Sequence, residues 1–226
     1  MPLNIGLLVF PKVQQLDLSG PYEVFASVPE VKVHLLWKTL DPVVSSTGLT
    51  LLPTRTFADC PALDVICVPG GIGIDALLED PQTLAFIQQQ AKAVRYVTSV
   101  CTGALLLGAA GLLLGRRATT HWASQSLLQA FGATVVHERV VRDGNLMTGG
   151  GVTAGIDFAL TLVSELFDDE VAQAVQLSLE YAPQPPFDSG HPSTAPADVL
   201  QRVVQRGAAV LANRQAIVGR WLEQQA

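Results

Sequence analysis

The sequence contains few cysteines, few charged residues and no long apolar run, and each shortage excludes a class of protein. Three cysteines in 226 residues form no even-numbered disulfide framework. No Cys-x-x-Cys pair or Cys/His cluster has the spacing of a zinc site. We therefore expect no metal ion, and we expect a reducing cytoplasm as the location.

Charged residues make up only 15% of the chain, with 14 Lys and Arg against 20 Asp and Glu. The net charge of -6 and the lack of a dense basic stripe argue against nucleic acid as a partner, because phosphate contacts need clustered Lys and Arg. The N-terminal MPLNIGLLVFPKVQQLD is apolar over only a few residues and has no basic start. It predicts a first strand, neither a secretion signal nor a membrane anchor.

Hydrophobic residues account for 49% of the chain, which is enough to bury the core of one α/β domain. Short apolar runs alternate with longer helical patterns. The expected strands are 5–10, 32–37, 64–68, 94–100, 134–136, 140–142 and 146–148, with a hairpin over 43–52. The expected helices are 18–27, 81–92, 102–111, 122–131, 154–167 and 170–179. This alternation predicts a mostly parallel sheet covered by helices on both faces.

A segment rich in Pro, Ser and Gly, YAPQPPFDSGHPSTAP, spans 181–196 and precedes an amphipathic helix over 198–221. We therefore predict a catalytic domain over 1–182. Residues 183–226 would form a Pro-rich tether and a C-terminal helix that packs on the same domain or on a dimer partner.

The cysteine at position 101 lies between an expected strand and an expected helix, where parallel sheets collect ligands. A helix N-terminus lowers the pKa of a cysteine, so this position predicts a thiolate at neutral pH. The pattern Ser99-x-Cys101-x-Gly103 is also similar to a nucleophile elbow. From its position alone, Cys101 could equally be a buried residue that only fills space in the core. For Cys60 and Cys67 we expect structural roles only.

Three segments together resemble the DJ-1/PfpI superfamily: LDLSGPYEVF over 16–25, LDVICVPGG over 63–71 and VTSVCTGALLLGAAGLLLGRRATTHW over 97–122. Within that superfamily the chain is most similar to the isocyanide hydratases. This likeness extends to the C-terminal segment YAPQPPFDSG over 181–190. The resemblance implies a flavodoxin-like three-layer sandwich and a homodimer. It also implies that Cys101 is the nucleophile.

The same resemblance places an acidic residue beside the cysteine, and here it matches Asp17. Glu23 is the rival, because many members use a glutamate in the following helix. Asp17 has an alternative structural role as the N-cap of the helix expected from residue 18.

Two departures from related enzymes restrict the chemistry that the resemblance implies. Thr102 stands where the PfpI proteases have histidine, and His137-Glu138 lacks the intervening residue of a glutamine amidotransferase. Neither peptide nor glutamine hydrolysis is therefore expected. For His121, in ATTHW, we expect a hydrogen-bonded structural histidine.

The activity implied by the resemblance is the hydration of an isocyanide to an N-substituted formamide, without metal or organic cofactor. Cys101 would form a covalent thioimidate, Asp17 would transfer protons, and Thr102 would orient water. Developing negative charge would be held at backbone amides of the Gly70-Gly71 loop and of Thr102. Gly150 would either give backbone room beside the substrate or pack the next helix on the sheet.

Two other functions remain open at this point. One is a glyoxalase III or DJ-1-like enzyme that acts on methylglyoxal with the same cysteine. The other is a ligand-sensing module, because AraC-type regulators share the LDLxGPxExF-like and ATTHW-like segments. Only 30 residues follow Pro196, so we expect no pair of helix-turn-helix units.

Overall fold

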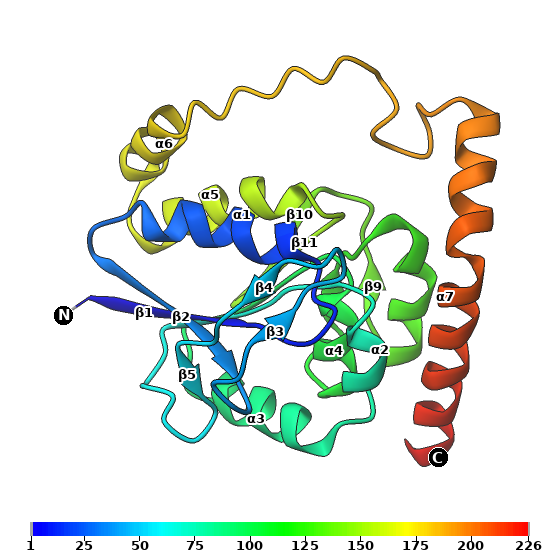
Figure 1. The fold of residues 1–226 in the computed structure, drawn as a ribbon, viewed down its shortest axis with the longest axis horizontal. Helices are drawn as coiled ribbons and strands as arrows, with labels where there is room; N and C mark the ends of the chain where they lie inside the picture. Colours follow the sequence, from blue (N-terminus) through cyan, green and yellow to red (C-terminus); the bar gives the residue numbers. More distant parts are fainter. Residues whose placement is uncertain (1, 226) are drawn as a thin grey trace.

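A seven-stranded sheet forms the centre of the computed structural model, which describes residues 2–225 (Figure 1). Its strand order is β10-β11-β7-β6-β1-β2-β5, and every neighbouring pair is parallel except β10 and β11. The strands are β1 (Leu3–Leu8), β2 (Val31–Trp37), β5 (Arg55–Thr56), β6 (Val65–Val68), β7 (Tyr96–Val100), β10 (Val140–Asp143) and β11 (Leu146–Gly149). All four residues of β6 are buried, as expected for a central strand covered on both faces.

Helices cover both faces of this sheet. On one face, α1 (Gln15–Ala26) packs beside α5 (Ala154–Leu166), which in turn contacts α6 (Asp169–Ser178). On the other face lie α3 (Pro81–Ala91), α4 (Gly103–Ala109) and the 3₁₀ helix η1 (Trp122–Phe131) (Figure 1). The predicted three-layer α/β architecture with a mostly parallel sheet is confirmed.

Small elements complete the body. The hairpin expected over 43–52 is present as β3 (Val43–Val44) and β4 (Thr50–Leu51), and β8 (Arg117–Ala118) pairs with β9 (Thr134–Val135) outside the main sheet. The helix expected from residue 18 begins earlier, at Gln15, with Gln14 as its N-cap residue. Asp17 therefore lies inside the first turn of α1 and does not cap it.

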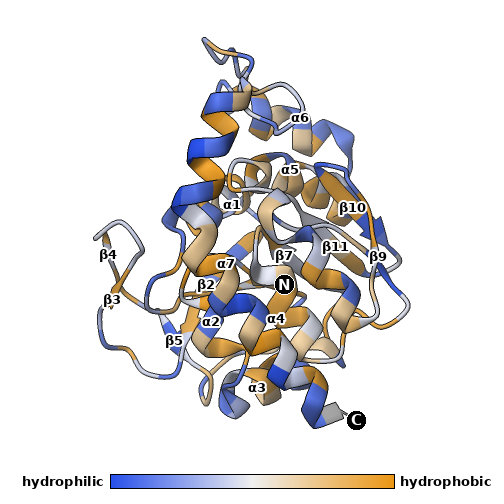
Figure 2. Cartoon of the chain, turned by 90° about the vertical axis from the view of Figure 1, so that its right-hand side faces the viewer, coloured by the Kyte–Doolittle hydropathy of each residue, from blue (hydrophilic) through white to orange (hydrophobic). Residues whose placement is uncertain are grey.

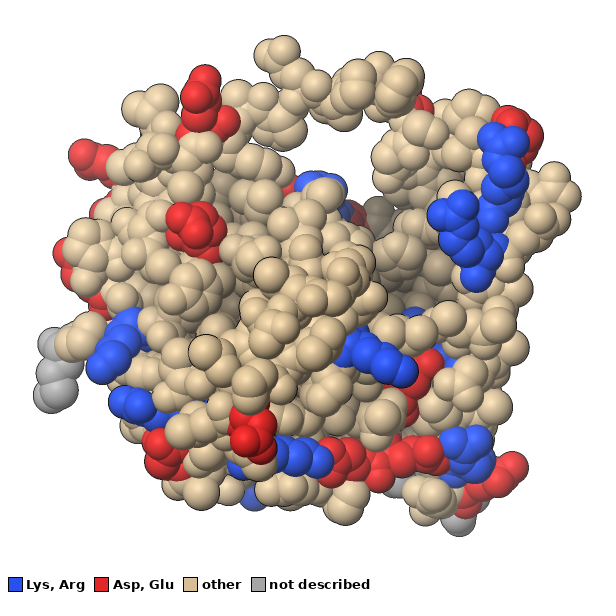
Figure 3. Space-filling model, viewed as in Figure 1, with Lys and Arg blue, Asp and Glu red and all other residues tan. Residues whose placement is uncertain are grey.

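The tether leads to the long helix α7 (Ala197–Gln225). In the space-filling view of Figure 3 an open gap separates the middle of the tether from the body. The second half of α7 packs against η1 and the short helix α2 (Ile74–Leu77) of the same chain, burying Ile217 and Val218. The first half is exposed over 201–209, so its apolar residues are exposed together with its polar ones. Figure 2 shows both kinds of residue along the helix. Within residues 2–225, no helix combines the length and apolar character needed to cross a bilayer.

Candidate active site

Cys101 lies at the carboxyl end of β7, between the strand and α4, and its φ is 55°. A positive φ is rare for residues other than glycine, so bonds around the cysteine must maintain it. The Cys101 amide lies 2.8 Å from the carbonyl oxygen of Gly150 and 3.1 Å from that of Gly149, and donates to both. The Cys101 carbonyl accepts a hydrogen bond of 2.7 Å from Oγ1 of Thr120. The strained turn is thus held from two sides.

Two glycines allow the backbone to close around this turn. A Cβ at Gly103 would lie 2.0 Å from the carbonyl oxygen of Val68, and one at Gly70 would lie 2.6 Å from the Thr102 amide nitrogen. The ends of β6 and β7 therefore approach each other more closely than a side chain permits. The Ser-x-Cys-x-Gly spacing has this steric cause.

Asp17 extends from the first turn of α1 and is completely buried. Its Oδ2 accepts a hydrogen bond of 2.9 Å from the Gly70 amide, while its Oδ1 is buried without a hydrogen-bond partner. Burial raises the pKa of Asp17 to about 7, although the Gly70 amide and the Cys101 thiol lower it in part. A carboxyl group with this pKa can both donate and accept a proton at neutral pH.

Burial also raises the pKa of Cys101 well above its ordinary value, and the negative charge of Asp17 raises it further. Hydrogen bonding from Thr102 lowers this pKa but does not compensate. The prediction that the helix N-terminus would yield a thiolate is therefore wrong for the structure at rest. The main reason is that the sulfur is removed from water, and the charge of Asp17 adds to the effect.

The hydroxyl group of Thr102 binds the glycine loop after β6. Its Oγ1 accepts a hydrogen bond of 3.0 Å from the Gly71 amide and lies 3.3 Å from the Gly71 carbonyl oxygen, to which it donates. The amides of Gly70 and Gly71 thus both have acceptors within the protein. To stabilise charge on a substrate, the Gly71 amide would have to exchange Thr102 for the substrate, so this role stays a prediction.

The structure therefore brings together the residues singled out in the sequence: Cys101, Asp17, Thr102, Gly70, Gly71 and Gly150. Glu23 lies exposed on α1, in contrast to the buried Asp17. The fully buried Cys67 lies within β6. Thr120 was missed by the sequence analysis, because a threonine two residues before a tryptophan carries no signal of a bond to a distant cysteine.

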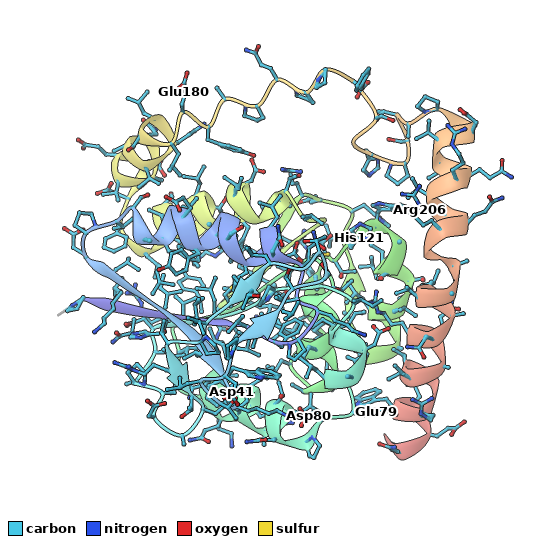
Figure 4. All side chains as sticks on the ribbon, viewed as in Figure 1. Asp41, Glu79, Asp80, His121, Glu180 and Arg206 are labelled. Atoms are coloured by element: carbon cyan, nitrogen blue, oxygen red, sulfur yellow. The ribbon has the colours of Figure 1, made fainter. Side chains whose placement is uncertain are left out.

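His121 has the hydrogen bond expected of a structural histidine: its Nδ1 accepts from the Ala123 amide at 3.3 Å, at the start of η1. Burial lowers the pKa of His121, and the nearby positive charge of Arg214 lowers it further. His121 is labelled in Figure 4, on the side of the body that faces α7. A neutral imidazole is the consequence.

A pocket of about 560 Å³ opens beside the cysteine turn. It is bordered by the loop before η1, by the start of α5 and by the tether; its lining includes Thr119, Thr120, His121, Trp122, Gly150, Val152, Ala154 and His191. Thr120 and Gly150 are the residues that hydrogen-bond the Cys101 backbone. The pocket is therefore one residue layer away from the candidate nucleophile. Across residues 2–225, no group of three or more His, Cys, Asp and Glu side chains is arranged to hold a metal ion.

Comparisons with known proteins agree with this geometry. The chain is 65% identical over 220 residues to an isonitrile hydratase of Pseudomonas putida, covering 97% of this chain and 96% of the relative. It is 30% identical to the HTH-type transcriptional regulator GbdR of Pseudomonas aeruginosa, but covers only 49% of that regulator. The crystal structure of a ThiJ/PfpI family protein from Pseudomonas syringae superposes with a TM-score of 0.94 at 44% identity, over 97% of this chain and 91% of the other.

The family model of DJ-1/PfpI matches residues 4–165. That range runs from β1 to the last turn of α5 and contains all the residues around Cys101 described above. The chain belongs to the DJ-1/PfpI family.

Proposed function

We propose that this protein hydrates isonitriles (isocyanides) to N-substituted formamides, with Cys101 as the covalent nucleophile. The full-length similarity to an isonitrile hydratase supports the substrate class. The observation that carries the chemistry is the buried pair of Cys101 and Asp17, in which the pKa of the carboxyl group is raised to about 7. Such a carboxyl group is partly ionised at neutral pH, so it can accept the thiol proton and later return it.

In the first half of the reaction, Asp17 accepts the proton of the Cys101 thiol while the sulfur attacks the terminal carbon of R-N≡C. Asp17 then donates that proton to the same carbon. One S–C bond and one C–H bond form, and the product is the thioimidate R-N=CH-S-Cys. A separate thiolate is not needed before the substrate arrives, which agrees with the raised pKa of Cys101.

In the second half, water attacks the thioimidate carbon as Asp17 removes one of its protons. The nitrogen takes up a proton, which gives the tetrahedral R-NH-CH(OH)-S-Cys. Collapse of this species breaks the S–C bond, releases R-NH-CHO and returns a proton to the sulfur. The sum is isonitrile plus water to formamide. The Thr102 hydroxyl would orient the water, in exchange for its bond to Gly71.

The group R would occupy the pocket beside the cysteine turn. Trp122, Val152 and Ala154 supply apolar surface there, and the tether residue His191 also lines the pocket. Apolar walls with a few polar groups are typical of small-molecule sites. The pocket of about 560 Å³ is large enough for a ring-bearing R group.

The assembly we propose is a homodimer, and the location is the cytoplasm. Large apolar side chains are exposed on the tether and on the first half of α7: Phe187 is 77% exposed, Val203 46% and Val204 49%. A second copy of the chain would cover them. The three cysteines are free, which fits a reducing compartment. Light scattering coupled to size exclusion should give the mass of two chains, and a monomer at micromolar concentration would exclude the dimer.

The test of the activity is the conversion of cyclohexyl isonitrile to its formamide, followed by NMR of the formyl proton. Wild-type protein should form the formamide, and Cys101→Ala should form none. Cys60→Ala is the matched control, since Cys60 lies outside the site, and it should keep full turnover. If wild-type protein consumed methylglyoxal and left the isonitrile unchanged, the proposal would be wrong and the glyoxalase alternative would replace it.

A further inference from the structure

We propose that Arg214 of α7 is a positioning residue for the active site, because it joins α2 and η1, the two elements whose preceding loops flank Cys101. The inference concerns the geometry of the cysteine turn and does not require that the substrate be an isonitrile.

The contacts of Arg214 are buried and specific. The residue is 5% exposed, although it belongs to a helix whose first half is exposed. Its Nε donates to Oδ1 of Asp75 in α2 at 2.6 Å, and its Nη1 donates to Oγ of Ser124 in η1 at 3.1 Å. The neighbouring Asn213 donates to the other Asp75 oxygen at 3.1 Å. One guanidinium group thus bridges two elements that are far apart in the sequence.

Each bridged element continues a loop of the active site. Asp75 follows Gly71 by four residues, and the Gly71 amide is the group that binds the Thr102 hydroxyl. Ser124 follows Thr120 by four residues, and Thr120 holds the carbonyl of Cys101. The guanidinium therefore connects the loop that bonds Cys101 with the loop that bonds its neighbour Thr102.

Stability alone does not explain why Arg214 and Asp75 form a buried ion pair. Replacing a buried ion pair by apolar residues of similar volume is often neutral or stabilising, so the charges are not required to hold α7 on the body. A fork of hydrogen bonds fixes orientation as well as distance, which apolar contacts do not. Orientation of the two loops is what the cysteine turn depends on.

A second ion pair between α7 and the region of α2 serves as a control. Arg220 of α7 forms an ion pair with Glu79 just after α2, with side chains that are 50% and 40% exposed. In Figure 4 the labelled Glu79 lies beside the C-terminal part of α7, the part that contains Arg220. This pair joins α7 to the α2 region but makes no bond to η1, and exposed pairs contribute little. Breaking it should leave the active site unchanged.

The decisive experiment uses the full chain with the double substitution Arg214→Met and Asp75→Leu, which removes both charges together. Thermal unfolding should show that the variant folds. Alkylation of Cys101 by iodoacetamide should change in rate, and its pH profile should shift relative to wild type. Turnover number should fall about tenfold with little change in KM, as expected when reacting groups lose their alignment. Arg220→Met should reproduce wild type in every measurement.

A second variant separates positioning from general support. Arg214→Lys can pair with Asp75 but cannot bridge to Ser124 as well, so its turnover should lie between those of wild type and the double variant. A folded double variant with the alkylation profile and turnover of wild type would overturn the proposal. If wild-type protein does not hydrate isonitriles, the alkylation profile still decides this inference.

Discussion

The amide of Gly70 donates a hydrogen bond of 2.9 Å to Oδ2 of Asp17, and so connects the end of β6 to the first turn of α1. With Oδ2 occupied, the partnerless Oδ1 is the oxygen left for proton exchange. Gly70 can approach this closely only because it lacks a Cβ, which would lie 2.8 Å from Oδ2. The position of the Asp17 carboxyl, the proposed general acid and base, therefore depends on a glycine 53 residues away in the sequence.

Asp17→Asn should lower turnover by about 10² to 10⁴-fold, the range expected when a general acid–base group is lost. The amide side chain keeps the size of the carboxyl group and can still accept from Gly70, so the fold should be retained. Product formation under saturating substrate is the measurement. Glu23→Gln, on the exposed side of the same helix, is the control and should retain normal turnover. Full activity of Asp17→Asn would remove the residue from the mechanism.

The pH dependence of stability should also report on Asp17. Its pKa is about 7 in the folded protein against 3.8 as the ordinary value, so folding favours the protonated carboxyl. The resulting stabilisation is complete below pH 3.8 and is lost as the pH rises to about 7. The total is about 4 kcal/mol at 1.36 kcal/mol per pKa unit. The free energy of unfolding in urea should fall more between pH 5 and pH 8 for wild type than for Asp17→Asn. An equal fall for the two proteins would contradict the burial argument.

Thr120→Val should impair catalysis without changing the shape of the side chain. It removes the 2.7 Å hydrogen bond to the Cys101 carbonyl, whose other donor is the Ala104 amide at 3.5 Å, at a cost of about 0.5–1.5 kcal/mol. The strained φ of Cys101 would lose one of its two supports, so turnover should fall as well. Thr161→Val is the comparison, since it removes an exposed bond within α5. Equal effects of the two changes on turnover would show that Thr120 has no special role.

Gly103→Ala should destabilise the protein or prevent its folding. The added Cβ would lie 2.0 Å from the carbonyl oxygen of Val68, so β6 and β7 would have to separate at the active site. Gly207→Ala adds the same atom in open space within α7 and should stabilise the protein by about 0.5–1 kcal/mol. Denaturant unfolding of both variants measures the contrast. Similar free energies of unfolding for the two would refute the steric explanation.

Trp122→Ala should raise KM for isonitriles with a bulky group R more than for methyl isonitrile. The indole supplies apolar surface in the pocket beside the cysteine turn, and a methyl group is too small to use it. Turnover number should change little, because Trp122 makes no contact with the reacting atoms in the proposed mechanism. A parallel rise in KM for both substrates would place the group R elsewhere.

The sequence by itself determined the layer architecture and the position of Cys101 at a strand-to-helix turn. Strands of adjacent apolar residues such as Val65–Val68 predict a sheet buried on both faces, because no alternation leaves one face polar. The strand, cysteine and glycine of 97–103 predict a turn that displays a side chain. These are local patterns, and the backbone obeys them with only small shifts in where each element begins and ends.

Only the tertiary structure decided the burial of Cys101 and Asp17 and the contacts of the C-terminal helix. The local helix N-terminus suggested a thiolate at Cys101, but burial and the charge of Asp17 raise its pKa instead. Nor does any local pattern relate Arg214 to Asp75 and Ser124, 139 and 90 residues away. Desolvation and long-range pairing depend on what surrounds a side chain in space, and that environment exists only after the sheet, its helices and α7 have packed together.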